Sequence, residues 1–245
     1  MNTQSPPQIF DKNLLRERGK KIDASNFLVK EIHSMLDERV EEINREFGST
    51  LAFQRDAEFL EGAENNFDLV KSSLAIHWVN DVVGLFLSAK RILREDGFFI
   101  ANFFGGETLK ELRQVFLEAD KNAISPRISP FIDVRDAGML LQRAGFAVPV
   151  VDSDRIEVTY GDIYALMKHL KRIGENNALL KRKRAFTGKK FMQKAAEIYK
   201  NRFSDEEGRI IATFEVITIS GYKPAASQQK PLKPGSGKIS LKDVL

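Results

Sequence analysis

The chain has 245 residues, 42% of them hydrophobic, which suits one large domain or two small ones with a substantial core. The formal net charge is only +4, and the absence of cysteine excludes disulfides, thiolate metal sites and cysteine nucleophiles. No apolar run approaches the roughly 18 residues of a membrane span, and the polar first ten residues lack the apolar core of a signal peptide. We therefore expect a cytoplasmic protein with no membrane span.

Basic residues are concentrated in two places. Residues 181–184 form a basic run, and the tail from Lys223 onward is also basic. Such a run suits an acidic protein partner or a nucleic acid, or it marks a solvated helix end. No zinc finger, aromatic RNA-binding motif or recognition helix accompanies the charge. We therefore expect no nucleic-acid partner.

The first part of the chain is predicted to be helical. Residues 11–43 have a helical composition, and their apolar residues recur at three- and four-residue spacing. We expect Asp23 or Ser25 to cap this helix and Gly48 to end it. Residues 1–47 are therefore assigned to an N-terminal helical segment.

A strand, a helix and a second strand follow. Residues 67–74 are typical of a strand, and residues 81–94 of an amphipathic helix. After a turn at Asp96-Gly97, residues 98–103 form a nearly continuous apolar run, which is typical of a strand covered on both faces. This βαβ order predicts an α/β fold with helices on both faces of a sheet.

The remaining elements continue this pattern. Helices are predicted over 108–122, 133–144, 163–173 and 190–202, the first with Thr108 and Glu111 as a capping box. Strands are predicted over 146–151, with 155–160 extending it beyond a turn, and over 210–222, where apolar alternation is strong. From residue 224, Pro, Gly and Ser indicate a flexible tail.

Several segments, in order along the chain, resemble class I S-adenosylmethionine (SAM)-dependent methyltransferases. Three are similar to the fourth strand, the loop after it and the fifth strand of that fold: Phe67-Asp68-Leu69-Val70, His77-Trp78-Val79-Asn80-Asp81 and residues 91–99. Others narrow the likeness: Gly105-Gly106-Glu107-Thr108-Leu109, Asp133-Val134-Arg135-Asp136-Ala137-Gly138, Gly174-Glu175-Asn176-Asn177-Ala178 and Ala212-Thr213-Phe214-Glu215. Together they resemble the bacterial and mitochondrial group of the complex I assembly factor that hydroxylates an arginine. That group is similar to the malonyl-carrier-protein methyltransferase of biotin synthesis.

This resemblance, over residues 9–47 and about 56–245, implies a Rossmann-like sheet, SAM as the cofactor and a respiratory-complex subunit as the protein substrate. The family opens its sheet with a strand, a glycine-rich turn and then a ribose-binding acid. The glycine-rich turn and the ribose-binding acid are both missing between Phe47 and Asp56. On the order of 40 residues of the family's fold are missing there too. We therefore predict a methyltransferase-like domain over 48–223 that lacks most of the first three strands. It carries a helical insertion at about 161–205 and is followed by a tail over 224–245.

The missing strands predict an unpaired edge. In the family the fourth strand is central, so without its neighbours residues 67–74 become an exposed apolar edge. Three consequences are open: a homodimer through this edge, a cover formed by residues 48–62, or a marginally folded chain.

Candidate site residues lie mainly after the predicted strands, where parallel α/β folds bind ligands. By resemblance His77 and Trp78 line the substrate side of the pocket; otherwise Trp78 is a core anchor and His77 a structural residue. By resemblance Asp56 and Glu58 contact the adenine amino group of SAM; a plain surface role is the alternative.

Glu107 and Arg127 complete the candidate substrate pocket, with a tight turn and an ion pair as the structural alternatives. Glu175-Asn176-Asn177 is either pocket lining or a plain turn. His33 and His169 have no second ligand at metal spacing, so no metal is expected. No catalytic triad or phosphate loop is recognisable, and the catalytic residues are therefore unknown.

Three functions stay open. The chain is a SAM-dependent enzyme that methylates its substrate or hydroxylates a protein arginine, a non-catalytic assembly chaperone that has lost the cofactor, or an inactive remnant. Methyl transfer requires chiefly an aligned acceptor in a desolvated pocket, so its catalytic residues are few.

Overall fold

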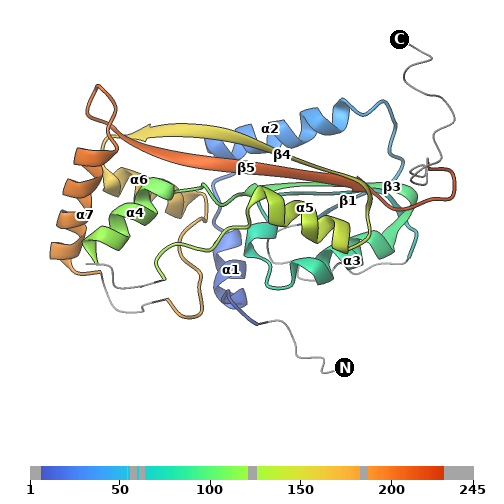
Figure 1. Cartoon of the computed structure of the whole chain (residues 1–245), viewed down its shortest axis with the longest axis horizontal. Coiled ribbons are helices and arrows are strands. Elements are labelled where there is room, and N and C mark those ends of the chain that lie inside the picture. Colours follow the sequence, from blue (N-terminus) through green and yellow to red (C-terminus); the bar gives the residue numbers. More distant parts are fainter. Residues whose placement is uncertain are drawn as a thin grey trace, which may run out of the picture.

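The computed structural model describes residues 7–53, 55, 60, 64–120, 126–182 and 187–228 (Figure 1). In these ranges the chain alternates helices and strands, with a short 3-10 turn η1 (Ile76–Trp78) after the second strand. The helices are α1 (Lys12–Gly19), α2 (Phe27–Glu41), α3 (Val82–Ile92), α4 (Lys110–Ala119), α5 (Val134–Arg143), α6 (Ile163–Arg172) and α7 (Lys189–Arg202). The strands are β1 (Thr50–Phe53), β2 (Phe67–Ser73), β3 (Leu93–Phe104), β4 (Ala147–Tyr160) and β5 (Ile210–Tyr222).

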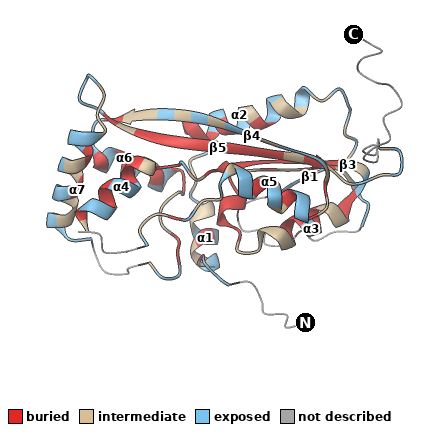
Figure 2. Ribbon diagram, in the orientation of Figure 1, coloured by how far each residue is buried: buried red, intermediate tan, exposed pale blue. Residues whose placement is uncertain are grey.

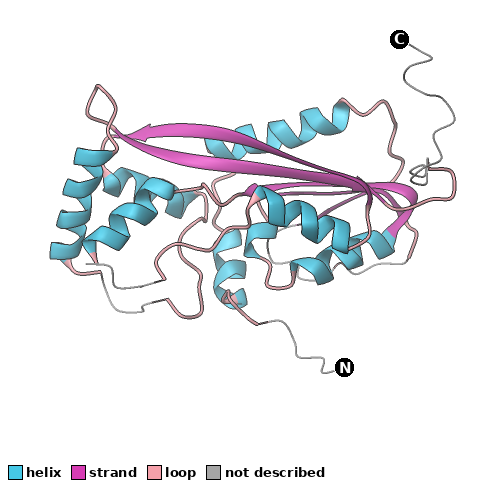
Figure 3. Cartoon of the chain, in the orientation of Figure 1, coloured by secondary structure: helices cyan, strands magenta, loops and turns pink. Residues whose placement is uncertain are grey.

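The strands form one mixed sheet in the order β1-β2-β3-β5-β4 (Figure 3). β1, β2 and β3 are parallel, whereas β5 runs antiparallel to both β3 and β4. The parallel part therefore has its carboxyl ends at one edge, which is where ligands bind in α/β folds.

Helices cover both faces of the sheet, as predicted (Figure 2). Side chains alternate between the faces along each strand, so neighbouring residues enter different apolar clusters. The cluster under α2 contains Leu36, Leu69, Phe98 and Ile100. The cluster under α3 and α5 contains, among others, Leu85, Val70, Phe99, Ala101 and Leu141. At the far end of the long β4–β5 pair, α4, α6 and α7 enclose Tyr199, Leu166 and Phe214.

The edge of β2 is paired, so the prediction that residues 67–74 form an exposed edge is wrong. β1 lies parallel to β2, with Thr50 opposite Leu69 and Phe53 opposite Ser72. The Ser72 hydroxyl also donates to the Phe53 carbonyl over 2.8 Å. Of the three alternatives, the cover by part of residues 48–62 is the one that the structure contains. β1 therefore occupies the edge through which a homodimer was predicted.

The N-terminal helical stretch is two helices, not one. Asp11 caps α1 and Asn26 caps α2, each by accepting a backbone N–H from its own first turn. The predicted cap Asp23 instead binds Ser25 and Arg172, so its carboxylate holds the turn between the helices.

The predicted capping box of α4 does not form. Leu109, with φ 56°, precedes the helix, and Thr108 Oγ1 donates to the Glu215 carbonyl on β5. The Glu111 carboxylate accepts the backbone N–H and the hydroxyl of Thr213. Both side chains therefore fasten α4 to the sheet, because β5 offers buried polar groups that need partners.

The predicted turn between residues 151 and 155 is also absent. β4 is a single long strand, and the irregularity lies earlier, between Ala147 and Val150, where Val148 has φ 47°. Pro149 interrupts pairing at this point, which is tolerated because β4 is an edge strand.

A buried chain of hydrogen bonds links α2, α6 and β4. His169 Nε2 donates to Asn26 Oδ1 over 3.0 Å, because an amide oxygen only accepts. His169 Nδ1 therefore accepts from the Tyr160 hydroxyl. Burial, and then the charge of Arg172, lower the pKa of His169. The folded chain thus favours the neutral imidazole.

We predict that the free energy of unfolding falls when the pH drops below about 6.5, the ordinary pKa of histidine. The folded chain disfavours protonation of His169, because its folded pKa lies below the unfolded one. The contribution of His169 to the free energy of unfolding is therefore complete above the unfolded pKa and is lost below it. Urea unfolding at about pH 7.5 and pH 5.5 measures the loss. His169→Gln should reduce this loss, with the remainder from His33, whose pKa burial also lowers. An equal loss in both proteins would contradict the assignment.

Candidate functional site

The chain turns inward directly after β2. Leu74 has φ 53°, and its N–H donates to the Asn102 carbonyl on the neighbouring strand. The turn η1 follows and carries His77 and Trp78 into the interior at the carboxyl end of the parallel strands, where both are almost fully buried. The position predicted from the sequence, after the strand and at the ligand-binding edge, is therefore confirmed.

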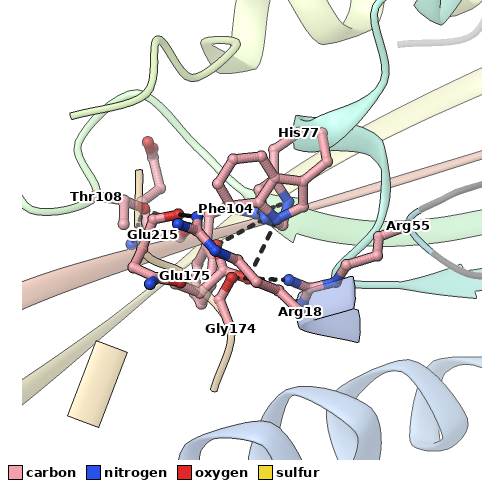
Figure 4. A network of polar contacts seen from close by, with 10 residues as sticks. Arg18, Arg55, His77, Phe104, Thr108, Gly174, Glu175 and Glu215 are labelled. Carbon is pink, nitrogen blue, oxygen red and sulfur yellow. Dashed lines mark hydrogen bonds and ion pairs between the residues drawn. The ribbon is translucent and has the colours of Figure 1, made fainter. Parts of the chain in front are cut away.

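Four side chains meet at this point, and we call them the Glu175 network: Arg55, His77, Trp78 and Glu175 (Figure 4). The Glu175 carboxylate accepts from Arg55 Nη2 at 3.0 Å, His77 Nε2 at 3.0 Å and Trp78 Nε1 at 3.3 Å. Arg55 Nη1 also donates to the Gly174 carbonyl over 3.0 Å. The side chains of Arg55, His77 and Glu175 are 7%, 0% and 4% exposed.

Local structure places Glu175 for this role. α6 ends at Arg172, and Gly174 adopts φ +74°, a conformation that a glycine takes at little cost. A Cβ at Gly174 would lie 3.0 Å from both Arg55 Nη1 and Ile22 Cγ1. The turn therefore needs glycine both for its backbone and for the approach of Arg55.

The hydrogen bonds also settle the protonation of the network. The Phe104 backbone N–H donates to His77 Nδ1 at 3.4 Å, so Nδ1 carries no proton and Nε2 carries one. Burial opposes ionisation of Glu175, but its contacts with His77 and Arg55 outweigh burial and hold its pKa below the ordinary value. Glu175 is therefore present in the network as a carboxylate that accepts from Arg55, His77 and Trp78.

This arrangement ties segments together rather than presenting a reactive group. Both nitrogens of His77 are engaged, and its ring packs on Phe104 and Phe131. Trp78 packs edge-on against Phe10 and shares a buried cluster with Leu179. In this structure neither ring presents a face to a ligand. Trp78 therefore has the role of a core anchor, which was the structural alternative for this residue.

The other predicted site residues lie elsewhere. Glu107 is 51% exposed and pairs with Lys110 over 3.1 Å. Arg127 pairs with Asp120, and its guanidinium lies 4.0 Å from the ring centroid of Phe191 on α7. The structure therefore does not bring these two to His77 and Trp78, and their role in a substrate pocket stays a prediction. Asp56 and Glu58, the predicted adenine contacts, lie outside the described residues.

The sequence does not mark Arg55, and for Glu175 it leaves pocket lining and a plain turn open. No local pattern marks Arg55, because its partners lie about 120 residues away. The one usable signal in the sequence is a charged residue shortly after the apolar stretch Leu51-Ala52-Phe53.

Two neighbouring cavities of about 240 and 250 Å³ lie between α2 and the ends of β1 and β2. Both are lined by His33 and Ser73, and Arg55 lines the first. In the part of the chain that the structure describes, no cluster of His, Asp or Glu could hold a metal ion. No helix there is both apolar enough and long enough to cross a bilayer.

Comparison with known proteins places the chain in a family. Residues 16–101 match the model of the methyltransferase domain. The chain is 40% identical over 190 residues to "Arginine-hydroxylase NDUFAF5, mitochondrial" of Dictyostelium discoideum, covering 76% of this chain and 43% of that protein. The human protein of the same name is 40% identical over 198 residues, covering 80% and 57%. The chain belongs to the class I SAM methyltransferase-like family.

A second group of relatives supports the same family. The malonyl-[acyl-carrier protein] O-methyltransferase of Laribacter hongkongensis is 39% identical over 180 residues, covering 74% of this chain and 59% of that protein. Among solved structures, the YcgJ protein of Bacillus subtilis aligns with a TM-score of 0.45 at 15% identity, over 83% of this chain and 81% of that one. The arginine hydroxylases above are matched over only 43% to 57% of their own lengths.

The residues around β1 do not fit SAM in the way the family binds it. Backbone approaches the cofactor at glycines after the first strand, yet Gln54, Arg55, Asp56 and Ala57 follow β1 here. The buried Arg55 side chain fills this place and engages Glu175. Arg55 and Glu175 therefore take up part of the strand-end crevice, beside the cavity that Arg55 lines.

We predict that Glu175→Ala destabilises the fold by about 3–5 kcal/mol, because it leaves the Arg55 guanidinium buried without its carboxylate. The double variant Arg55→Met/Glu175→Gln, which removes both charges and keeps an acceptor for His77 and Trp78, should recover most of the loss. Urea unfolding measures both.

The matched control is Arg94→Ala, which breaks a more exposed ion pair with Asp68 and should cost less than about 1 kcal/mol. Equal losses for Glu175→Ala and Arg94→Ala would show that the Glu175 network does not hold the strand ends together.

Proposed function

We propose that this methyltransferase-family chain acts in the assembly of respiratory complex I, where it binds a protein subunit of that complex. The supporting observation is its identity of about 40% to the arginine hydroxylases over 76% to 80% of its length. The segments that carry the resemblance to the assembly-factor group include the loop after β3, α5, the turn at Glu175 and β5. These are the parts of the fold that remain complete.

Two modes of action follow from the family. In the enzyme mode the chain binds SAM and either methylates the subunit or hydroxylates one of its arginines. In the binding mode the chain holds the subunit and transfers nothing. Two observations favour the binding mode: the buried Arg55–Glu175 ion pair lies at the end of β1, and no glycine-rich turn follows β1 in the sequence.

Calorimetric titration separates the two modes. With SAM or S-adenosylhomocysteine at up to about 1 mM, the upper end of ordinary KM values, we expect no binding heat. A micromolar Kd would overturn the binding mode and establish the enzyme mode. As a control, a variant with a glycine-rich strand–turn–helix inserted after Phe47 should bind SAM, since it restores the close backbone approach.

Co-purification tests the assembly role itself. A tagged chain expressed in respiring cells is expected to retain a complex I subunit, identified by mass spectrometry, whether or not SAM binds. Retention of no complex I subunit, with the chain folded and soluble, would contradict the proposed function. A tagged variant with Glu175→Ala serves as the control for retention by partly unfolded protein.

A further inference from the structure

A groove of about 420 Å³ lies away from the Glu175 network. Its walls are the start of the described chain, the loop over 126–130 and the segment at residues 179–181. The walls are tied to one another: the Leu180 N–H donates to the Ile9 carbonyl over 2.9 Å, and Asn177 Nδ2 donates to the Pro126 carbonyl over 2.7 Å. The groove is therefore a formed feature of the fold, which lowers the entropic cost of binding.

Apolar surface dominates the walls and continues past them. Ile9, Ile128 and Leu179 line the groove, together with three prolines. Ile9 and the neighbouring Leu180 are exposed although both are large and apolar. A continuous apolar surface of this kind typically marks a site for a partner.

Charge at the groove has one sign. Among the described residues that line it, Arg113 and Lys181 are the charged ones, and none is acidic. Arg113 donates to the carbonyls of Gly106 and Thr108, which carry no formal charge. Lys181 forms no ion pair with any described residue. Neither cation forms an ion pair with a carboxylate of the described residues, and together they give the groove a positive potential.

We propose that this groove binds an acidic, extended segment of a protein partner, with apolar side chains against Ile9 and Ile128 and carboxylates at Arg113 and Lys181. Its volume lies within the roughly 300–1,000 Å³ typical of binding pockets, which suits a few side chains of one segment. The proposal rests on the proposed function only in taking the partner to be a protein. Basic segments are disfavoured because they meet two uncompensated cations.

A peptide selection tests this chemistry directly. A degenerate hexapeptide library is passed over the immobilised full chain at low salt, and the retained peptides are sequenced. We expect enrichment of peptides that combine Asp or Glu with Leu, Ile or Phe. Affinity for one such synthetic peptide should fall roughly tenfold in Lys181→Glu, since the charge contact becomes a repulsion.

The matched control is Lys190→Glu, which makes the same charge change at the exposed start of α7, outside the groove. Its peptide affinity should stay within about twofold of the unmodified chain. Absence of enrichment, enrichment of basic peptides, or equal weakening by both variants would overturn the proposal. If the chain co-purifies with a complex I subunit but Lys181→Glu retains it equally, the groove is wrong while the assembly role stands. If nothing co-purifies but acidic peptides bind, the assembly role fails and the groove stands.

Discussion

A buried carboxylate organises the middle of this molecule. Glu175 is 4% exposed, and an ionised group so placed is costly unless its charge and its acceptor positions are matched. Its three donors come from different parts of the chain: one follows β1, and two lie on the turn after β2. The requirement to satisfy this one group therefore fixes the loop after α6 against the carboxyl ends of the parallel strands (Figure 4).

The same interaction ties the end of the short strand β1 to the turn after α6. The family leaves this edge open for a cofactor, with glycines where the backbone must approach it. Here Arg55 extends from the end of β1 into that space, and the four-residue β1 pairs the edge of β2. A short edge strand also limits pairing with other chains.

Family membership and the geometry of the strand end thus concern different parts of the chain. Identity of about 40% to the arginine hydroxylases covers most of this chain but only 43% to 57% of those proteins. The match to the methyltransferase domain spans residues 16–101 and so includes β1, β2 and most of β3, whereas the Arg55–Glu175 ion pair lies at the end of β1. The groove lined by Arg113 and Lys181 is the surface at which we propose that a partner binds.

The sequence by itself determined the α/β class, the strands β2 and β5, and the helices α3, α5, α6 and α7. Their hydrophobic periods and caps are local and strong. It also placed His77 and Trp78 after a strand. Only the tertiary structure decided that β1 covers the edge of β2, that Thr108 and Glu111 bind β5 instead of capping α4, and that Arg55 reaches Glu175. Each of these depends on partners far away along the chain, and a buried polar group takes whichever partner the packing brings to it.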